Sequence, residues 1–163
     1  LPAHPAPCPA LYNRGGLRGA AGPLLAPCDP RHPHAVYLID LDRFKPINDL
    51  HGHDAGDAVL RSLAERLTAA VRPDDLVARI GGDEFVVMTA RLDPDADADA
   101  RALDLGMTVG YALAPHDGRL LGDLLKRADA AMYAGKLAGR GGVRRGAAGA
   151  GMAAEHREAE PAH

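Results

Sequence analysis

The chain has 163 residues, with 19 Lys and Arg against 22 Asp and Glu and a formal charge of -3. This length allows one domain, and the near-neutral charge argues against a protein that chiefly binds nucleic acid or an anionic membrane surface. No stretch approaches the roughly 20 apolar residues that a membrane-spanning helix needs. Alanine supplies 32 residues, whereas Leu, Ile, Val and Phe together supply only 34, so we expect a small core.

The chain is divided by its prolines. Eight of the 13 lie in residues 1–34, which predicts poor packing of that segment, and four lie in residues 35–140. From residue 141 onward Gly, Ala and charged residues predominate, and their burial cannot offset the entropy of ordering. We predict a Pro-rich segment over 1–34, the folded domain over 35–143 and a disordered tail over 144–163.

Cellular location is indicated by two features of the sequence. Residues 1–10 have neither the basic start nor the continuous apolar segment of an export signal. The two cysteines, Cys8 and Cys28, suggest no disulfide framework and favour a reducing compartment. We therefore expect a cytoplasmic segment with no nucleic-acid or membrane partner.

The first predicted elements are a strand and a helix. Residues 35–42 form an apolar run that becomes acidic at Asp40, which is typical of a buried strand that presents carboxylates at its C-terminal edge. Asp54 can cap a helix that reaches Val71, because leucines and valines recur on one face of that segment. Pro73 prevents the helix from continuing.

The remaining elements are a hairpin, a strand and a helix. Residues 76–80 and 83–88 are apolar runs that flank Gly81-Gly82, which predicts a β-hairpin with a two-residue turn. A third apolar strand is expected over 107–113, followed by a helix over 120–137. The order strand, helix, hairpin, strand, helix predicts an α/β sandwich.

Carboxylates at strand ends are the first candidate for chemistry. Asp40 ends one strand, while Asp83 and Glu84 open another, so pairing of these strands would bring the three acids together. Such a cluster suits Mg²⁺, which binds through one or two carboxylates and substrate phosphates. The acids alone are equally typical of a solvated turn. Gly81 and Gly82 favour a ligand, because they let a nucleotide phosphate approach the backbone.

Three separated motifs resemble the GGDEF domain of diguanylate cyclases, a family of bacterial second-messenger signalling. They are RIGGDEF over 79–85, the segment from DLDRFKPIND to the GD pair over 40–57, and ADAAMYAGK over 128–136. A weaker fourth motif, LYNR over 11–14, resembles the opening motif of the family. The resemblance implies a palm-type, nucleotidyl-cyclase-like α/β (α+β) sandwich, with the GGDEF turn on a β-hairpin and helices packed on the central sheet.

The resemblance also implies which residues bind metal and nucleotide. A Mg²⁺ or Mn²⁺ site is implied at Asp40, the carbonyl of Leu41, Asp83 and Glu84. The positions implied to bind the guanine edge are Asn48 and Asp57. The phosphates are implied to meet the turn and three cations: Gly81, Gly82, Lys45, Lys136 and Arg140. Independently, the i, i+4 spacing of the last two would place both on one helix face, although a solvated basic face would show the same pattern.

The implied reaction joins two GTP molecules into cyclic di-GMP and releases pyrophosphate. Each 3′-hydroxyl attacks the α-phosphate of the other nucleotide, with Asp83 or Glu84 as base or only as metal ligand. Since each domain holds one GTP, the resemblance implies a homodimer, with an upstream sensor domain as a possible partner. Arg72 and Asp75 match the product-inhibition motif of the family, although Arg72 could instead pair locally at a helix exit.

The sequence departs from the family between Met88 and Met107. Only 18 residues intervene, and their middle, residues 94–101, is acidic and alanine-rich, which predicts a shortened crossover helix that covers the sheet poorly. Three hypotheses follow: an active cyclase, a catalytically weak or inactive receptor for GTP or cyclic di-GMP, and a truncated product that does not fold stably. Competent residue types at all the matched positions favour the active cyclase.

Overall fold

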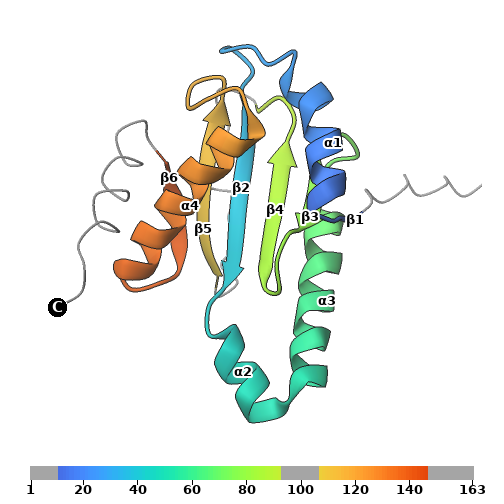
Figure 1. Ribbon diagram of the computed structural model, residues 1–163, viewed down its shortest axis with the longest axis vertical. Helices are drawn as coiled ribbons and strands as arrows, with labels where there is room; N and C mark the ends of the chain where they lie inside the picture. The colour runs from blue at the N-terminus through green and yellow to red at the C-terminus, as the bar shows by residue number, and fades with distance from the viewer. Residues whose placement is uncertain (1–10, 93–106, 147–163) are drawn as a thin grey trace, which may run out of the picture.

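The computed structural model describes residues 11–92 and 107–146, which form a mixed sheet with helices packed on it (Figure 1). The helices are α1 (Arg14–Leu25), α2 (Phe44–His51), α3 (His53–Ala70) and α4 (Leu121–Leu137). The strands are β1 (Leu11–Tyr12), β2 (His34–Leu41), β3 (Leu76–Arg79), β4 (Glu84–Thr89), β5 (Met107–Ala114) and β6 (Gly142–Arg145). The predicted α/β sandwich is confirmed.

The sheet has six strands in the order β1-β3-β4-β2-β5-β6. β2 lies at the centre and pairs antiparallel with β4 and β5, whereas β1 and β6 pair parallel at the two edges. In this register Asp40 lies directly opposite Glu84 on one side and Thr108 on the other. Directly opposed residues point to the same face of a sheet, so these three side chains share one face.

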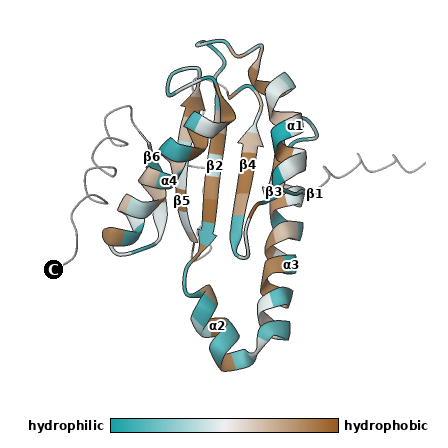
Figure 2. Cartoon of the chain, in the orientation of Figure 1, coloured by the Kyte–Doolittle hydropathy of each residue, from teal (hydrophilic) through white to brown (hydrophobic). Residues whose placement is uncertain are grey.

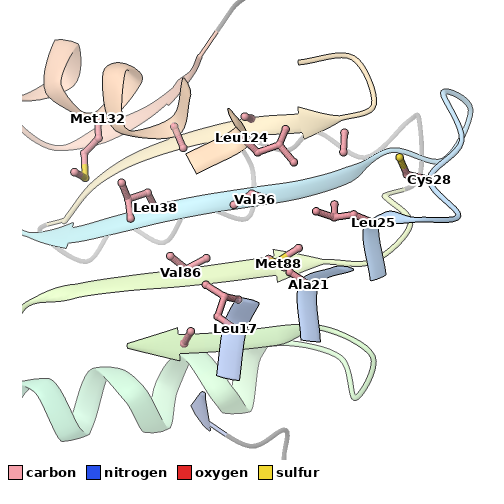
Figure 3. Packing of buried hydrophobic residues seen from close by; sticks show 14 residues of the cluster. Leu17, Ala21, Leu25, Cys28, Val36, Leu38, Val86, Met88, Leu124 and Met132 are labelled. Atoms are coloured by element: carbon pink, nitrogen blue, oxygen red, sulfur yellow. The ribbon is translucent and has the colours of Figure 1, made fainter. Parts of the chain in front are cut away.

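The alternation of side chains along the strands divides the core into two clusters. On one face, Val36 and Leu38 of β2 pack with Val86 and Met88 of β4 beneath α1 and α4 (Figure 3). On the other face, strand residues that include Phe85 pack against three leucines of α3: Leu60, Leu63 and Leu67. Because side chains alternate along a strand, residues that follow one another in β2 contribute to opposite clusters.

The hairpin and the first long helix differ in detail from the predictions. The two-residue turn is wrong, because β3 ends at Arg79 and β4 begins at Glu84, which leaves residues 80–83 in the loop. The N–H of Ile80 donates to the carbonyl of Glu84 at 3.0 Å and closes that loop. α3 begins at His53 rather than after a capping Asp54, because Gly52, with φ +86°, makes the entry to the helix.

Residues 11–34 are folded, so the expectation of poor packing is wrong for them. Asn13 caps the start of α1, because its side chain accepts a hydrogen bond from the N–H of Gly16 at 2.8 Å. Leu17, Ala21 and Leu25 recur every four residues and are buried in the cluster beneath α1 and α4. The predicted domain boundary at residue 35 stays a prediction, but the core already begins in α1.

The C-terminal segment is also folded further than predicted. β6 extends the sheet through residue 145, and the guanidinium of Arg145 forms two hydrogen bonds, at 3.1 and 3.2 Å, with the buried carboxylate of Asp117. The predicted shortened crossover over 94–101 lies outside the described residues, as does the tail from residue 147. Among the described helices, none is both long and apolar enough to cross a bilayer.

α2 was not predicted. It is an eight-residue helix that follows β2 directly, with Pro46 in its first turn, where the missing N–H costs no intrahelical bond. None of its residues is buried. Together with the start of α3, it projects beyond the C-terminal end of β2 (Figure 1). α2 and the start of α3 therefore lie next to the sheet edge at which Asp40 and Glu84 face each other.

α4 packs unusually close to β5. A Cβ added at Gly110 would lie 1.9 Å from the carbonyl oxygen of Ala128 and 2.6 Å from the backbone nitrogen of Met132. Backbone atoms of a helix cannot give way as the end of a flexible side chain can. The missing side chain of Gly110 therefore determines how near α4 lies to the sheet.

We predict that Gly110→Ala lowers the free energy of unfolding by about 2 kcal/mol or more, because overpacking at a rigid contact forces the helix away from the strand. Gly122→Ala is the control, since a Cβ there meets no atom within 4 Å; we expect a change below about 1 kcal/mol for it. Urea denaturation of both variants measures the difference. Equal stabilities would contradict the close-packing account.

Candidate active site

The candidate site lies at the edge of the sheet where β2 ends and β4 begins. Both strands are hydrophobic along most of their length and turn hydrophilic at this edge (Figure 2). Asp40 continues the side of β2 that carries Val36 and Leu38, so its carboxylate lies at the end of an apolar row and faces α4. The sheet register therefore sets two carboxylates, Asp40 and Glu84, side by side.

Asp40 is nearly buried, with 7% of its surface exposed. Its Oδ2 forms an ion pair with the ammonium of Lys136 in the last turn of α4. Its Oδ1 is buried and has no hydrogen-bond partner. A buried acceptor of this kind is costly unless something satisfies it, so this oxygen is a candidate ligand position.

Asp83 lies in the hairpin loop beside these groups. Burial raises the pKa of the Asp83 carboxyl, a side-chain hydrogen bond with Asp40 raises it further, and the nearby charges of Asp40 and Glu84 act in the same direction. Crowding of like charges has this effect because each ionised carboxylate disfavours ionisation of the next. A cation bound at this edge would therefore stabilise the three clustered carboxyl groups.

The charge and the unpartnered Asp40 oxygen fit a divalent cation such as Mg²⁺. Within residues 11–92 and 107–146, however, no three His, Cys, Asp or Glu side chains are already gathered as a metal site. The ammonium of Lys136 supplies the positive charge next to Asp40 in this arrangement. The unpartnered Oδ1 is therefore the position at which Asp40 could bind a cation, since Lys136 occupies only Oδ2.

The glycine turn leaves open space in front of the backbone. A Cβ added at Gly82 would meet no atom within 4 Å, and one at Gly81 would meet the side chain of Glu84 at 3.3 Å. Arg79 bonds to the carbonyls of both glycines, and its shortest contact is 2.8 Å, from Nη2 to Gly82. Arg79 was not among the predicted site residues, although it opens the RIGGDEF motif.

The residues proposed for guanine lie on α2 and α3. The Oδ1 of Asn48 is buried and has no hydrogen-bond partner. A Cβ on Gly56 would lie 1.7 Å from this atom, so Asn48 can occupy its position only because residue 56 has no side chain. Asp57 follows Gly56 and is exposed, as is Lys45 on α2. The sequence could not reveal that Gly56 makes room for Asn48.

Lys136 and Arg140 do not share a helix face, so that prediction is wrong. α4 ends at Leu137, and Gly139, with φ +117°, reverses the chain. The N–H of Arg140 then donates to the carbonyl of Gly135 at 3.1 Å, which is a common way to end a helix. Arg140 nevertheless stays near the site, because its guanidinium lies 3.8 Å from the carboxylate of Asp42.

Arg72 and Asp75 form a closed turn after α3. The buried carboxylate of Asp75 accepts from the N–H of Arg72 at 2.8 Å and from the N–H of Ala90 at 2.9 Å. The half-exposed guanidinium of Arg72 donates to the carbonyl of Ala90 at 3.2 Å. Asp75 is thus enclosed by the backbone, and Arg72 is the member of the pair that faces solvent.

The same turn borders a hollow of about 370 Å³ that is also lined by His34 and Arg91. His34 is 3% exposed, and its Nδ1 lies 3.3 Å from the N–H of Arg91, for which it is the acceptor. Burial lowers the pKa of His34, and the charge of Arg91 lowers it further. Both effects disfavour the protonated form of the imidazole.

Comparison with known sequences gives a consistent result. The sequence profile described as "Diguanylate cyclase, GGDEF domain" matches residues 7–103. The diguanylate cyclase TpbB of Pseudomonas aeruginosa is 39% identical over 154 residues, a match that covers 83% of this chain but only 35% of TpbB. An uncharacterized 19.3 kDa protein of Streptomyces ambofaciens is 41% identical, and 85% of this chain and 81% of that protein are covered.

Solved structures agree with the sequence comparison. The GGDEF domain of TpbB from Pseudomonas aeruginosa superposes with a TM-score of 0.80 at 37% identity, and 93% of this chain and 99% of that chain are covered. The GGDEF domain of DgcB from Caulobacter crescentus, in complex with c-di-GMP, superposes with a TM-score of 0.69 at 25% identity, over 86% and 92% of the two chains. The likeness thus extends over almost the whole of both solved domains.

We predict that His34 makes the fold less stable in mild acid. Its pKa in the folded chain lies below the ordinary histidine value of about 6.5, so the unfolded chain binds more protons, and stability falls as the pH drops below about 6.5. His34→Asn keeps an acceptor and removes the proton site, so its unfolding free energy should depend less on pH between 7 and 5. Equal pH dependence of this variant, the wild type and the exposed control His51→Asn would contradict this assignment.

Proposed function

This chain belongs to the GGDEF family of diguanylate cyclases, and from that membership we propose that it condenses two GTP molecules into cyclic di-GMP and pyrophosphate. The observation that carries the proposal is the acidic sheet edge, where Asp40 and Glu84 lie side by side and a buried oxygen of Asp40 has no partner. Buried acceptors in folded proteins mostly have a partner, so this oxygen supports a role in binding a ligand.

The residues that we propose to hold Mg²⁺ or Mn²⁺ are Asp40, the carbonyl of Leu41, Asp83 and Glu84. When bound, the metal neutralises phosphate charge and lowers the cost of deprotonating the attacking hydroxyl. The ammonium of Lys136 leaves Asp40 and pairs with a phosphate oxygen, so that the carboxylate and the cation exchange partners. This exchange keeps the charge of the edge balanced before and after the nucleotide arrives.

The remaining contacts orient the nucleotide. We propose that Asn48 and Asp57 bind the guanine edge, where a carboxylate that accepts from the ring N–H and the amino group selects guanine over adenine. Lys45 and Arg140 provide further positive charge for the triphosphate. The open space at Gly81 and Gly82 allows the phosphates to approach the backbone.

In the reaction that we propose, the 3′-oxygen of one GTP forms a bond to the α-phosphorus of the other. The bond from that phosphorus to the bridging oxygen breaks, and pyrophosphate leaves with the electron pair. Asp83 or Glu84 accepts the proton of the hydroxyl. A second such step closes the ring. Two chains, each with one GTP, must therefore face each other, which makes a homodimer the catalytic unit.

The chain covers only 35% of the length of TpbB, which therefore has further segments that the chain does not match. We propose that a sensor domain elsewhere in the protein controls how often two catalytic domains meet. The substrate and the metal are those of the cytoplasm, which is where we place the reaction.

We further propose that the product inhibits the enzyme at Arg72. A guanidinium can bond to a guanine edge or a phosphate, and that of Arg72 is half-exposed beside a hollow. The sequence suggested that Asp75 contacts the product as well. Since both of its oxygens accept backbone N–H groups, we now give it the role of holding the turn that presents Arg72.

Glu84→Gln tests the cyclase proposal. The change keeps the size of the side chain and removes its charge, so we expect synthesis of cyclic di-GMP from GTP and Mg²⁺ to fall at least about 100-fold, with unfolding unchanged. Chromatography with mass detection of cyclic di-GMP and pyrophosphate measures the loss. Glu65→Gln, at an exposed position on α3, is the matched control.

Normal synthesis by Glu84→Gln would contradict the assigned site. If the wild type makes no product but binds cyclic di-GMP, the domain is a receptor instead of a cyclase. If it neither reacts nor binds and shows no cooperative unfolding, the third hypothesis of the sequence analysis, a product that does not fold stably, is the correct one.

Arg72→Ala tests product inhibition. We expect the initial rate to stay within about twofold of the wild type, because Arg72 is not among the proposed substrate contacts. Added cyclic di-GMP should inhibit the variant much less than the wild type, since the exposed guanidinium is lost. Progress curves at increasing product concentration measure this. Inhibition that is identical in both proteins would sink the regulatory role.

A further inference from the structure

Asp42 is an acidic residue of the site that none of the sequence arguments singled out. It lies one position beyond the end of β2 and two residues after Asp40, and only 12% of its side chain is exposed. Its neighbour in sequence, Asp40, has an unpartnered oxygen. Asp42 is bonded very differently, and this difference assigns the two carboxylates to different tasks.

Both oxygens of Asp42 are occupied. The hydroxyl of Thr108, the second residue of β5, donates to Oδ1 at 2.7 Å. The backbone N–H of Gly141 lies 3.1 Å from Oδ2 and also 3.1 Å from the Thr108 hydroxyl oxygen. The guanidinium of Arg140 lies 3.8 Å from Oδ1. Asp42 therefore joins the end of β2, the start of β5 and the turn between α4 and β6.

The turn that Asp42 holds has an unusual backbone. Residues 139–142 all have positive φ, with values of 117°, 62°, 72° and 85°, and three of the four are glycines. The exception is Arg140, whose left-handed conformation costs energy for a residue with a side chain. Such a backbone is flexible when unbound, so hydrogen bonds must define it. The N–H groups of Gly139 and Arg140 donate to the carbonyls of Lys136 and Gly135 at the end of α4. The N–H of Gly141 is held from the sheet instead, because it donates to Asp42 and to the hydroxyl of Thr108.

The contact of Asp42 with Arg140 itself is weak. It is 3.8 Å long, and about half of the arginine side chain is exposed, so solvent screens the attraction. A guanidinium held in this way can turn to a phosphate without loss of the turn. The strong contacts, to Gly141 and Thr108, do not involve the guanidinium and persist when it turns.

We propose that Asp42 is a positioning residue, which holds the Gly141 turn so that Arg140 faces the phosphates of GTP, and that it is not a metal ligand. This inference rests on the proposed function, which supplies GTP as the ligand. The positioning role itself rests on the hydrogen bonds of Asp42. Both of its oxygens already accept hydrogen bonds, whereas Oδ1 of Asp40 accepts none. Removal of Asp42 should therefore impair recognition of the triphosphate and leave recognition of the base intact.

The test compares, by calorimetry in the presence of Mg²⁺, the binding of GMP and of GTP, the latter supplied as its 3′-deoxy analogue so that no cyclic di-GMP forms. We expect Asp42→Asn to weaken GTP binding about tenfold and GMP binding less than twofold, because only the triphosphate reaches Arg140. Thr108→Val, which removes the hydroxyl and keeps the shape, should show the same selectivity. Glu65→Gln, which removes a remote exposed charge, should change neither.

A double-mutant cycle separates positioning from general loss of structure. In an Arg140→Ala background, Asp42→Asn should add less than about twofold to the loss of GTP affinity, because the residue acts through Arg140. Amide exchange at Gly141 should be faster in Asp42→Asn than in the wild type, and this measurement requires no nucleotide.

Three results would overturn the proposal. Equal losses for GTP and GMP, or additive losses in the cycle, would mean that Asp42 supports the fold in general. Loss of Mg²⁺ binding, measured without nucleotide, would make it a metal ligand. Unchanged exchange at Gly141 would remove the mechanism even if the cyclase assignment holds. A wild type that binds neither nucleotide would instead refute the proposed function, and the role of Asp42 toward GTP with it.

Discussion

The antiparallel register of β2 and β4 is the constraint on which the rest of the site depends. It pairs Asp40 with Glu84 and, on the same face, Val36 with Met88 and Leu38 with Val86. A shift by one residue would turn these apolar side chains to the other face and move the carboxylates away from α4. The register is thus set by hydrophobic burial, and the acidic edge follows from it. Core and site cannot vary independently in this fold.

The charge of that edge is balanced by α4 and the turn that follows it. Lys136 reaches Asp40 because α4 packs so closely on β5 that only a glycine fits at residue 110. Beyond the helix, Asp42 and Thr108 hold Gly141, while Arg145 ties β6 to Asp117. The packing of α4 on β5 therefore holds Lys136 in place. The turn that carries Arg140 is held by its bonds to Asp42 and Thr108 and by β6, which follows it. These contacts thus stabilise the fold and would also position the residues that we propose to bind the substrate.

The sequence predicts the parts of the fold that have a clear period. The strands from β2 to β5 and the helices α3 and α4 follow from runs of apolar residues with period two or 3.6. The glycines and Pro23 of α1 obscure its helical pattern in the sequence. Its buried face can be recognised only once the sheet that it packs on is known. β6 is short and exposed, and its place depends on a parallel partner and on the pairing of Arg145 with a residue 28 positions earlier.

Candidate site residues are easier to name from the sequence than the partners of those residues. The acids at the strand ends and the glycine turn are local features, and the family resemblance adds the cations. The ion pair of Lys136 with Asp40 joins residues 96 positions apart, and the bond from Gly141 to Asp42 joins residues 99 positions apart. No local pattern encodes such contacts, because they arise when α4 packs on the sheet. For the same reason the spacing of Lys136 and Arg140 suggested a shared helix face that the glycine at 139 prevents.

The most direct test is calorimetric binding of GTP and ATP to the wild-type chain, with and without Mg²⁺, both supplied as 3′-deoxy analogues so that no cyclic di-GMP forms. We expect one GTP per chain, tighter binding with Mg²⁺, and at least about tenfold weaker binding of ATP, because the guanine edge and the acidic edge both contribute. Equal affinity for the two nucleotides, or GTP binding that does not respond to Mg²⁺, would contradict the assignment of the acidic edge as the nucleotide and metal site.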